Sequence, residues 1–280
     1  MQAPTGATRL AAVIGSPVRH SLSPVLHNAA FDAVGLDWTY VALEVAEGRA
    51  PDALTGMRAL GLGGLSVTTP HKEAVAAACD RLSDDAAALG AVNCVVPDGD
   101  LLVGHNTDGP GFVAALRAEG HDPADARCVV IGAGGAGRAV ALALARAGAR
   151  EVAVVNRSAE RAAAAVALVG PTGRVVAPDA VVAAVTSADL VVNATTVGMG
   201  ATTGSEIPVP ADALHGGQHV VDIVYRPLET LFLREARGRG ATATNGVPML
   251  VHQAAVAFEL WTGVPAPVAA MAGSVAHLLG

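Results

Sequence analysis

One stretch of the chain, residues 127–158, constrains the fold more than any other. It opens with the apolar run 127–131, passes through a glycine-rich turn and an alanine-rich segment, and ends in a second apolar run at 151–155. Short runs of β-branched residues indicate buried strands, and an alanine-rich segment is typical of a helix. The stretch therefore predicts a strand, a glycine loop, a helix over 135–147 and a second strand.

The glycine loop fits the pattern Gly-x-Gly-x-x-Gly at Gly132, Gly134 and Gly137. The first glycine allows a tight turn, the second lets the backbone approach a pyrophosphate, and the third lets the helix pack on the strand. The N-terminus of the helix would present free N–H groups to phosphate. The alternative is a tight glycine turn in an ordinary α/β protein, and the flanking strands and helix favour the dinucleotide loop.

The residues after the second strand indicate which dinucleotide is bound. A NAD-binding unit usually has a carboxylate there for the ribose 2′-hydroxyl. Here the sequence reads Asn156, Arg157, Ser158, with Arg161 one turn further on. Guanidinium groups match phosphate geometry, so we predict NADP rather than NAD. The alternative is that both arginines only solvate the start of a helix.

Composition excludes several classes of protein. A chain of 280 residues forms one large domain or two modest ones, and at 52% apolar residues it can bury a large core. We see no run of 18 uninterrupted apolar residues and no signal-peptide pattern at the N-terminus, so we expect no membrane association. The net charge of −7, without a basic block, argues against nucleic acid.

The cysteines and histidines point to no metal. Cys79, Cys94 and Cys128 lack metal-ligand spacing, and no His-Glu-x-x-His occurs. Cys94 and Cys128 lie in apolar strand patterns, so we interpret them as small core residues of a protein in the reducing cytoplasm.

The first part of the chain alternates predicted strands and helices with polar residues at their junctions. Ser23 followed by Pro24 predicts a helix N-cap with proline at N1, and Pro70 suits another helix start with Lys72 in its first turn. A cation there opposes the helix dipole, which hints at function. The predicted strands are 10–14, 38–45, 64–67, 91–96 and 101–104, and the predicted helices are 23–33, 52–60, 84–89 and 112–118.

Two further polar positions stand out before the glycine loop. Asn93 lies inside an apolar run, so it is either a hydrogen-bonding post in the core or a ligand contact. Of the residues that precede Gly109, Thr107 suits a helix cap, whereas Asp108 is available for other work.

Beyond the glycine loop the periodicity predicts a doubly wound sheet. Six strands alternate with helices after Arg127, as a dinucleotide-binding sheet requires. The Gly- and Pro-rich segment 195–210 is long enough to be a mobile site loop. The strands after 151–155 are predicted at 174–177, 189–193, 218–225 and 241–244, and the helices at 158–169, 178–185, 228–238, 248–261 and 268–279.

A set of motifs in a fixed order resembles the shikimate dehydrogenase family. The set runs from about residue 13 to 263, and its motifs are Ser21-Leu-Ser23-Pro24, Val67-Thr68-x-Pro70-x-Lys72, Gly90-Ala-Val-Asn93, Asn106-Thr-Asp108-Gly-x-Gly111, the glycine loop, Asn156-Arg157-Ser158-x-x-Arg161, Asn193-Ala-Thr195, Asp222-Ile-Val-Tyr225-x-Pro227, Gly246-x-x-Met249-Leu-x-x-Gln253 and Trp261-Thr-Gly263. One departure is Ser66, where the family often has Asn.

The resemblance implies two α/β domains with a cleft between them. A discontinuous N-terminal substrate domain would comprise residues 1–108 and 246–280, and a Rossmann-type NADP-binding domain residues 109–245. The two terminal helices would return to pack on the first domain.

The resemblance also implies an activity, the NADPH-dependent, reversible reduction of 3-dehydroshikimate to shikimate in aromatic amino acid biosynthesis, the chorismate pathway. Lys72 would be the principal acid/base and Asp108 its orienting partner. The implied substrate-binding residues are Ser21, Ser23, Thr68, Asn93, Tyr225 and Gln253. The implied cofactor-binding residues are Gly132, Ala133, Gly134, Gly135, Ala136, Asn156, Arg157, Ser158, Arg161, Ile223, Gly246 and Asp84.

Three alternatives stay open at this point. A sister enzyme of the family could act on quinate or aminoshikimate, and Ser66 keeps this open. A non-catalytic NADP-binding regulator could share the fold, although it would need neither Lys72 nor Asp108. A folate-interconverting dehydrogenase fits the Ser21–Ser23 loop and the helix of Gln253 less well. We expect a small-molecule substrate and a monomer or homodimer.

Overall fold

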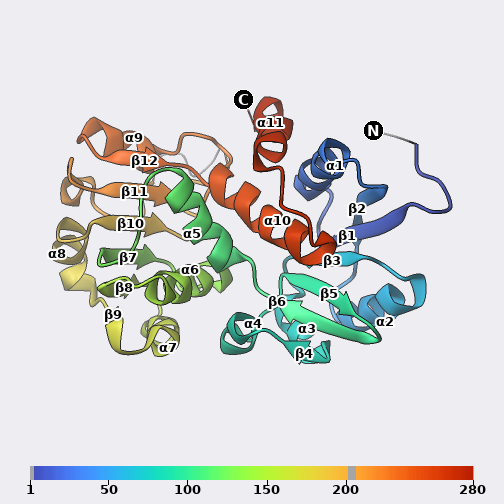
Figure 1. The fold of residues 1–280 in the computed structure, drawn as a ribbon. Helices are drawn as coiled ribbons and strands as arrows, with labels where there is room; N and C mark the ends of the chain where they lie inside the picture. Colours follow the sequence, from blue (N-terminus) through green and yellow to red (C-terminus); the bar gives the residue numbers. More distant parts are fainter. Residues whose placement is uncertain (1–2, 201–205, 280) are drawn as a thin grey trace. The chain divides into compact units, whose positions relative to one another are not determined.

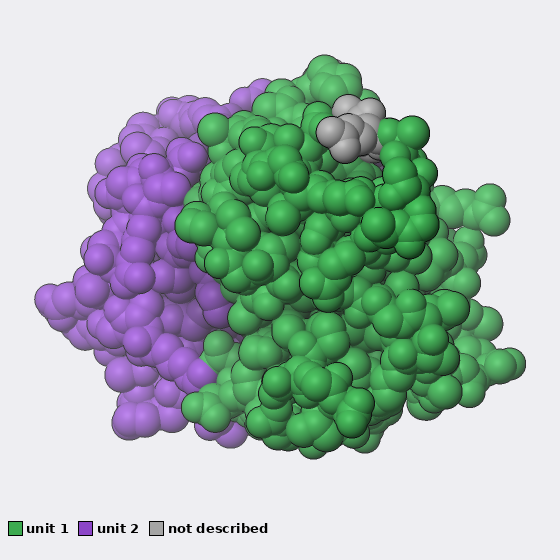
Figure 2. Space-filling view, turned by 45° about the vertical axis from the view of Figure 1, so that its right-hand side comes forward, with its two compact units in different colours: residues 1–107, 251–278 green, residues 108–250, 279–280 purple. Residues whose placement is uncertain are grey.

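The chain folds into two α/β units in the computed structural model, which describes residues 3–200 and 206–279. Unit 1 comprises Met1–Thr107 and Val251–Leu278, and unit 2 comprises Asp108–Leu250 with Leu279–Gly280 (Figure 2). The chain thus leaves unit 1 after Thr107 and returns to it at Val251. The predicted fold class of two α/β domains is confirmed.

Unit 1 is built on a mixed sheet with the strand order β2-β1-β3-β5-β6-β4. Strand β1 pairs in parallel with β2 and β3, whereas β5 is antiparallel to both β3 and β6. The carboxyl ends of β1, β2, β3 and β6 and the amino end of β5 therefore meet at one edge. The strands are β1 Arg9–Gly15, β2 Trp38–Glu44, β3 Gly64–Val67, β4 Arg81–Leu82, β5 Cys94–Asp98 and β6 Leu101–His105.

The helices of unit 1 follow these strands, and two of them come from the C-terminal end of the chain. Trp261 ties α10 to the sheet, because its Nε1 donates to the Val95 carbonyl at 3.1 Å. Its ring lies so close to Gly64 that an added Cβ would be 2.4 Å from it. The helices are α1 Ser23–Ala33, α2 Ala50–Leu60, α3 Lys72–Ala78, α4 Asp84–Leu89, α10 Val247–Thr262 and α11 Val268–Leu279, of which α10 begins in unit 2.

Unit 2 is a parallel sheet with the strand order β12-β11-β10-β7-β8-β9 (Figure 1). From the centre of the sheet, β7, β8 and β9 follow one another towards one edge, and β10, β11 and β12 follow one another towards the opposite edge. The strand order therefore reverses between β7 and β10. This is the Rossmann arrangement, in which ligands bind at the carboxyl ends of the strands near the reversal. The strands are β7 Arg127–Ile131, β8 Glu151–Val155, β9 Gly173–Val175, β10 Leu190–Asn193, β11 His219–Asp222 and β12 Thr242–Thr244.

Helices cover both faces of this sheet, as the doubly wound prediction requires. Alternate strand residues point to opposite faces, and Val130 and Val129 belong to different core clusters. Phe112 and Leu144 pack in the first cluster, and Phe232 packs in the second. The helices are α5 Asp108–Ala118, α6 Gly135–Arg146, α7 Ala159–Val169, α8 Val181–Thr186 and α9 Leu231–Gly238, with short 3₁₀ turns at Gly170–Thr172, Pro178–Ala180 and Ala211–Ala213.

Four predicted helix starts were wrong, and the one expected at residue 228 lies at Leu231, because Thr230 is the N-cap of α9. Ser23 is the first helical residue and not the N-cap, because Leu22 accepts the first backbone bond, from Leu26, at 3.1 Å. Helix α3 begins at Lys72 and not at Pro70, since a turn closed by the His71 N–H precedes it. Helix α5 begins at Asp108, four residues earlier than predicted.

Two predicted strands also differ from the structure. Asn93 precedes β5 instead of lying within it, and its backbone bonds to neighbouring strand ends, donating to His105 and accepting from Val67. Strand β11 ends at Asp222, so Ile223 and Tyr225 belong to the following loop. Part of the predicted mobile loop, residues 201–205, lies outside the described residues, and its mobility stays a prediction.

Candidate active site

The glycine loop joins β7 to α6 at the carboxyl edge of the unit 2 sheet. Gly132 has φ of +107°, and a Cβ on Gly137 would lie 2.0 Å from the Gly132 carbonyl oxygen, so both positions require glycine. By contrast, Gly134 and Gly135 are exposed, and a Cβ on either would meet nothing within 4 Å. Open space therefore lies in front of the α6 N-terminus, whose first N–H groups have no partner inside the helix.

Not every N–H of the loop is available to a phosphate. The Gly132 N–H donates to the Val155 carbonyl at 2.8 Å, and the Ala133 N–H donates to Asn156 Oδ1 at 3.1 Å. The donors that face open space are those around Gly134 to Ala136. This arrangement fits a pyrophosphate held by the backbone and the dipole of α6.

The segment after β8 fits an adenosine phosphate. Asn156 braces the glycine loop, and its Nδ2 also donates to the Ser158 carbonyl at 3.0 Å. Ser158 caps α7 by accepting the Arg161 N–H at 3.3 Å. The side chains of Arg157 and Arg161 are exposed, and no carboxylate stands at 156–159. Two solvent-facing guanidinium groups at this strand end suit a 2′-phosphate.

The loop after β11 provides a further backbone surface in unit 2. Ile223 donates its N–H to the Asn193 carbonyl at 3.0 Å, and Gly246 donates its N–H to the Val224 carbonyl at 3.0 Å. A Cβ on Gly246 would lie 2.0 Å from the Ile223 carbonyl oxygen. The structure therefore brings together Ile223 and Gly246, both predicted to line the nicotinamide.

The predicted substrate residues of unit 1 lie at one edge of its sheet. Ser21 and Ser23 follow β1 at the start of α1, and Ser21 Oγ accepts the Ser23 N–H at 3.2 Å. Thr68 follows β3, and its N–H donates to the Ile14 carbonyl at 2.9 Å. The structure thus places these hydroxyls on neighbouring strand ends.

Lys72 and Asn93 are joined to the same edge by backbone bonds. The Lys72 carbonyl accepts the Val92 N–H at 3.0 Å, next to Asn93. Asn93 is buried, and its side chain accepts the Thr107 N–H at 2.7 Å and donates to Thr107 Oγ1 at 3.0 Å. The Asn93 side chain therefore has a structural role in holding Thr107, while its contact with a ligand stays a prediction. The Thr107 hydroxyl bonds to Asn93, which the predicted cap role did not anticipate.

The remaining predicted residues are distributed over both units. Gln253 is half-buried on α10 in unit 1, whereas Tyr225 is half-buried in the β11–α9 loop of unit 2. Asp108 is buried at the first position of α5 in unit 2. Asp84 is exposed on α4 of unit 1, whereas the other predicted cofactor residues belong to unit 2.

One polar residue that the sequence reasoning missed is Tyr40 on β2. It is 2% exposed, and its hydroxyl lies beside Ser66 and Ser23, yet no described residue meets the full geometry of a hydrogen bond to it. Burial raises the pKa of Tyr40, and the Ser66 and Ser23 side chains offset part of this rise. A buried tyrosine needs a partner for its hydroxyl, and that requirement was the available signal.

His27 packs against Tyr40 in the interior of unit 1. It is 1% exposed, its ring stacks on Tyr40 with centroids 4.4 Å apart, and Trp261 lies 4.9 Å away. Burial lowers the pKa of His27 to about 3. His27 is therefore neutral at physiological pH and packs against Tyr40 and Trp261 from the buried face of α1.

Comparisons with known proteins agree with this arrangement. A model of the shikimate dehydrogenase substrate binding domain matches residues 13–95, one of shikimate/quinate 5-dehydrogenase matches 114–223, and one of the shikimate 5'-dehydrogenase C-terminal domain matches 246–275. The NADP(+) shikimate dehydrogenase of Moorella thermoacetica is 48% identical over 94% of this chain and 91% of its own length.

The chain belongs to the shikimate dehydrogenase family.

Solved structures of the shikimate dehydrogenase family agree with this assignment. The Thermus thermophilus shikimate 5-dehydrogenase in complex with NADP(H) and shikimate has a TM-score of 0.89 and 41% identity, covering 96% of this chain and 99% of that one. A quinate dehydrogenase from Corynebacterium glutamicum in complex with NAD has a TM-score of 0.88 at 33% identity, covering 95% and 98%. Both likenesses extend over nearly the whole chain.

The described residues provide neither a membrane-spanning helix nor a metal-binding cluster. Within 3–200 and 206–279, no helix combines the length and the apolar character that a membrane span needs. Across the same residues, no group of three or more His, Cys, Asp or Glu side chains could hold a metal ion.

Proposed function

We propose that the chain reduces the ketone of 3-dehydroshikimate to shikimate with NADPH, and catalyses the reverse reaction with NADP, in aromatic amino acid biosynthesis. The observation that carries this proposal is the set of hydroxyl, amide and ammonium side chains at one edge of the unit 1 sheet, joined by the backbone bonds from Val92 to Lys72 and from Val67 to Asn93. A small acid with several ring hydroxyls needs such a set of directional partners.

The cofactor would be held by unit 2. The backbone around Gly134 to Ala136 would bind the pyrophosphate at the start of α6, and Arg157 and Arg161 would bind the 2′-phosphate. Ile223 and Gly246 would line the nicotinamide through their backbones. NADPH supplies the hydride, so the protein itself must position, polarise and protonate the substrate.

Protonation of the nascent alkoxide would fall to Lys72. Lys72 lies at the first position of α3, where its charge opposes the helix dipole, so a stabilising role in the helix does not account for it. We assign it as the principal acid/base, with Asp108 as its carboxylate partner and as an acceptor for a substrate hydroxyl. The pairing of these two residues stays a prediction.

Substrate recognition would use both hydrogen-bond donors and hydrogen-bond acceptors. Ser21, Ser23 and Thr68 would bind the carboxylate through their hydroxyls. Asn93 and Gln253 would bind ring hydroxyls, and Tyr225 would contact the substrate from unit 2. Removing one such partner is expected to cost about 1–3 kcal/mol of transition-state binding.

Two further properties are part of the proposal. The three cysteines carry free thiols, which suits a cytoplasmic protein. We expect a monomer or homodimer. Asp84 keeps its proposed cofactor role only by resemblance, because its exposed position on α4 gives no independent support.

The direct test of the reaction is the reductive direction. Purified protein, NADPH and 3-dehydroshikimate are mixed, the loss of nicotinamide absorbance is followed, and the product is identified by chromatography. Shikimate formed in equal amount to the NADPH consumed supports the proposal. Binding of NADPH without its consumption in the presence of 3-dehydroshikimate would contradict the proposed reaction and favour a non-catalytic regulator.

A further inference from the structure

A buried carboxylate, that of Asp222, stands at the carboxyl end of β11 with no role in the reaction described above. It is 0% exposed and accepts hydrogen bonds from Asn193 Nδ2 at 3.0 Å, from the Val224 N–H at 3.1 Å and from Thr230 Oγ1 at 2.7 Å. Burial raises the pKa of Asp222, and the bonds from Thr230, Val224 and Asn193 offset part of that rise. A carboxylate that is costly to bury marks a position where its bonds matter.

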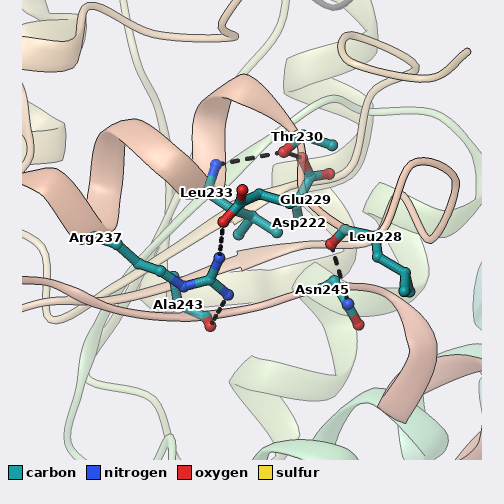
Figure 3. A network of polar contacts seen from close by, with 8 residues as sticks. All are labelled: Asp222, Leu228, Glu229, Thr230, Leu233, Arg237, Ala243 and Asn245. Atoms are coloured by element: carbon teal, nitrogen blue, oxygen red, sulfur yellow. Dashed lines mark hydrogen bonds and ion pairs between the residues drawn. The ribbon is translucent and has the colours of Figure 1, made fainter. Parts of the chain in front are cut away.

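Asp222 joins the two ends of the loop 223–230. Thr230 ends this loop and caps α9, because its Oγ1 also accepts the Leu233 N–H at 3.3 Å. Residues 222 and 230 are thus tied by one side-chain bond, while Val224 is held to the same carboxylate. Figure 3 shows Asp222, Thr230 and Leu233 at the start of α9.

Other side chains hold the same loop from outside. Asn245 Nδ2 donates to the Leu228 carbonyl at 3.1 Å, and Arg237 pairs with Glu229 at 2.7 Å while donating to the Ala243 carbonyl at 2.9 Å (Figure 3). The Arg237 and Glu229 side chains are exposed, so their pair contributes little. The buried Asp222 cluster therefore holds the loop near both of its ends, through Val224 and Thr230.

The loop carries residues that the proposed function uses. Ile223 begins it and lies against Gly246, and the Val224 carbonyl accepts the Gly246 N–H. Tyr225 follows directly. A shift of the Val224 backbone would therefore move the proposed nicotinamide wall and the proposed substrate tyrosine together.

The bond to Asn193 extends this constraint to the glycine loop. Asn193 is 0% exposed; its Oδ1 accepts the Thr195 N–H at 3.1 Å and Oγ1 at 2.7 Å, and its Nδ2 donates also to the Val197 carbonyl. The turn it holds lies against Gly132, where an added Cβ would be 2.8 Å from the Ala194 carbonyl oxygen. Asp222 thus bonds to the β11 loop directly, and it reaches the pyrophosphate loop through Asn193 and the turn at Ala194.

We propose that Asp222 is a positioning residue for hydride transfer. Through Val224 and Thr230 it fixes the loop that presents Ile223 and Tyr225, and through Asn193 it fixes the turn beneath the glycine loop. All three partners donate to it, and only a carboxylate offers enough acceptor sites in this position. The inference rests on the proposed function, since it assigns the geometry that this function requires.

Three variants and one matched control test this inference. Asp222→Ala removes all three bonds, Asp222→Asn can keep those to Oδ1, and Thr230→Val removes one donor. The control is Gln218→Ala on the amino side of the same strand, because Gln218 is 2% exposed and anchors Val185 and His215 by hydrogen bonds at 2.6 and 3.0 Å. Its side-chain hydrogen bonds, as described by the structure, involve no residue assigned to substrate or cofactor.

The readouts are the melting temperature, kcat, and the KM values for NADP and shikimate, with kinetics measured well below every melting temperature. We expect Asp222→Ala to lower kcat/KM about 100-fold and to raise both KM values, since misplacing reacting groups by about 1 Å costs that much. Asp222→Asn and Thr230→Val should each lose about tenfold or less. Gln218→Ala should lower the melting temperature but leave kcat and both KM values unchanged.

The outcomes distinguish a failure of the proposed function from a failure of the positioning role of Asp222. If the wild-type protein does not oxidise shikimate with NADP, the proposed function fails and the inference falls with it. If the wild type is active and Asp222→Ala lowers the melting temperature but leaves the kinetics unchanged, as expected for Gln218→Ala, Asp222 is only structural. Should the alanine variant not fold, Asp222→Asn is judged by the same criterion. A rise in both KM values that Asp222→Asn partly restores supports the positioning role.

Discussion

Two glycines of the same loop should respond in opposite ways to the addition of one methyl group. At Gly134 the backbone has φ of −78° and ψ of −172°, which alanine adopts readily, and an added Cβ meets nothing within 4 Å. Gly134→Ala should therefore leave the fold intact and stabilise it by as much as about 0.4–1 kcal/mol through the unfolded chain. The added methyl would instead occupy the space in front of the α6 N-terminus.

The expected functional cost follows from the bonds that the pyrophosphate would lose. A hydrogen bond from a backbone N–H to a charged group contributes about 1.5–3 kcal/mol. Losing one should raise the KM for NADP by a factor of about 10 to 100, because 1.4 kcal/mol corresponds to tenfold. The KM for shikimate should stay unchanged, since no residue assigned to shikimate belongs to the glycine loop.

Gly137→Ala is the contrasting variant. Its Cβ would lie 2.0 Å from the Gly132 carbonyl oxygen and 2.8 Å from the carbonyl carbon, so helix and loop must separate by about 1 Å. Such overpacking costs about 1–3 kcal/mol, and the melting temperature should fall.

The assay for both variants combines thermal melting with steady-state kinetics. An unchanged KM for NADP in a folded Gly134→Ala protein would refute the pyrophosphate assignment. An unchanged melting temperature in Gly137→Ala would refute the packing argument.

Three further predictions concern the cofactor phosphate, the proton donor and acid stability. The double variant Arg157→Ala, Arg161→Ala should raise the KM for NADP about tenfold or more and leave the KM for NAD unchanged. The control, Arg117→Ala at an exposed position on α5, should change neither KM. An equal rise in the KM for both dinucleotides would count against a 2′-phosphate site. Lys72→Ala should lower kcat by about 10² to 10⁴ while NADPH binding, followed by fluorescence, persists; near-full turnover would remove Lys72 from the mechanism. Because burial lowers the pKa of His27 from 6.5 to about 3, its neutral form stabilises the fold fully above pH 6.5, and this stability is lost as pH falls towards 3. At pH 5 the loss is about 2 kcal/mol, so His27→Leu should unfold less steeply with acid than the wild type in melting curves, and parallel pH profiles would contradict the assignment.

The parts of the fold set by local chemistry were predictable from the sequence. Strands β7 and β8, the glycine loop and helix α6 agree with the prediction, because β-branched runs, alanine content and glycine spacing act over a few residues. The order of motifs was sufficient to predict the family and the NADP-binding sheet. The ends of helices and strands were less predictable. Helix α1 begins at Ser23 and strand β11 ends at Asp222, and both residues form hydrogen bonds, to Ser21 and to Asn193, that local sequence preferences do not reveal.

The polar contacts that the sequence did not reveal all depend on long-range pairing. Tyr40 meets Ser66 and Ser23 only because β2 and β3 flank β1 in the sheet. Thr107 meets Asn93 across the β5–β6 pair, and Asp222 meets Asn193 because β10 and β11 are neighbours. In each case strand order decides the contact, and a single sequence does not contain it directly.

The measurement that tests the central claim most directly is a four-way comparison of kcat/KM, in which shikimate and quinate are each offered with NADP and with NAD. The account predicts rapid reduction of NADP with shikimate, slower turnover with quinate, and values lower by at least about tenfold with NAD, which lacks the 2′-phosphate and its charge-assisted contacts. Equal or faster turnover with quinate and NAD would contradict it, and would make Ser66 and Arg157 the first residues to re-examine.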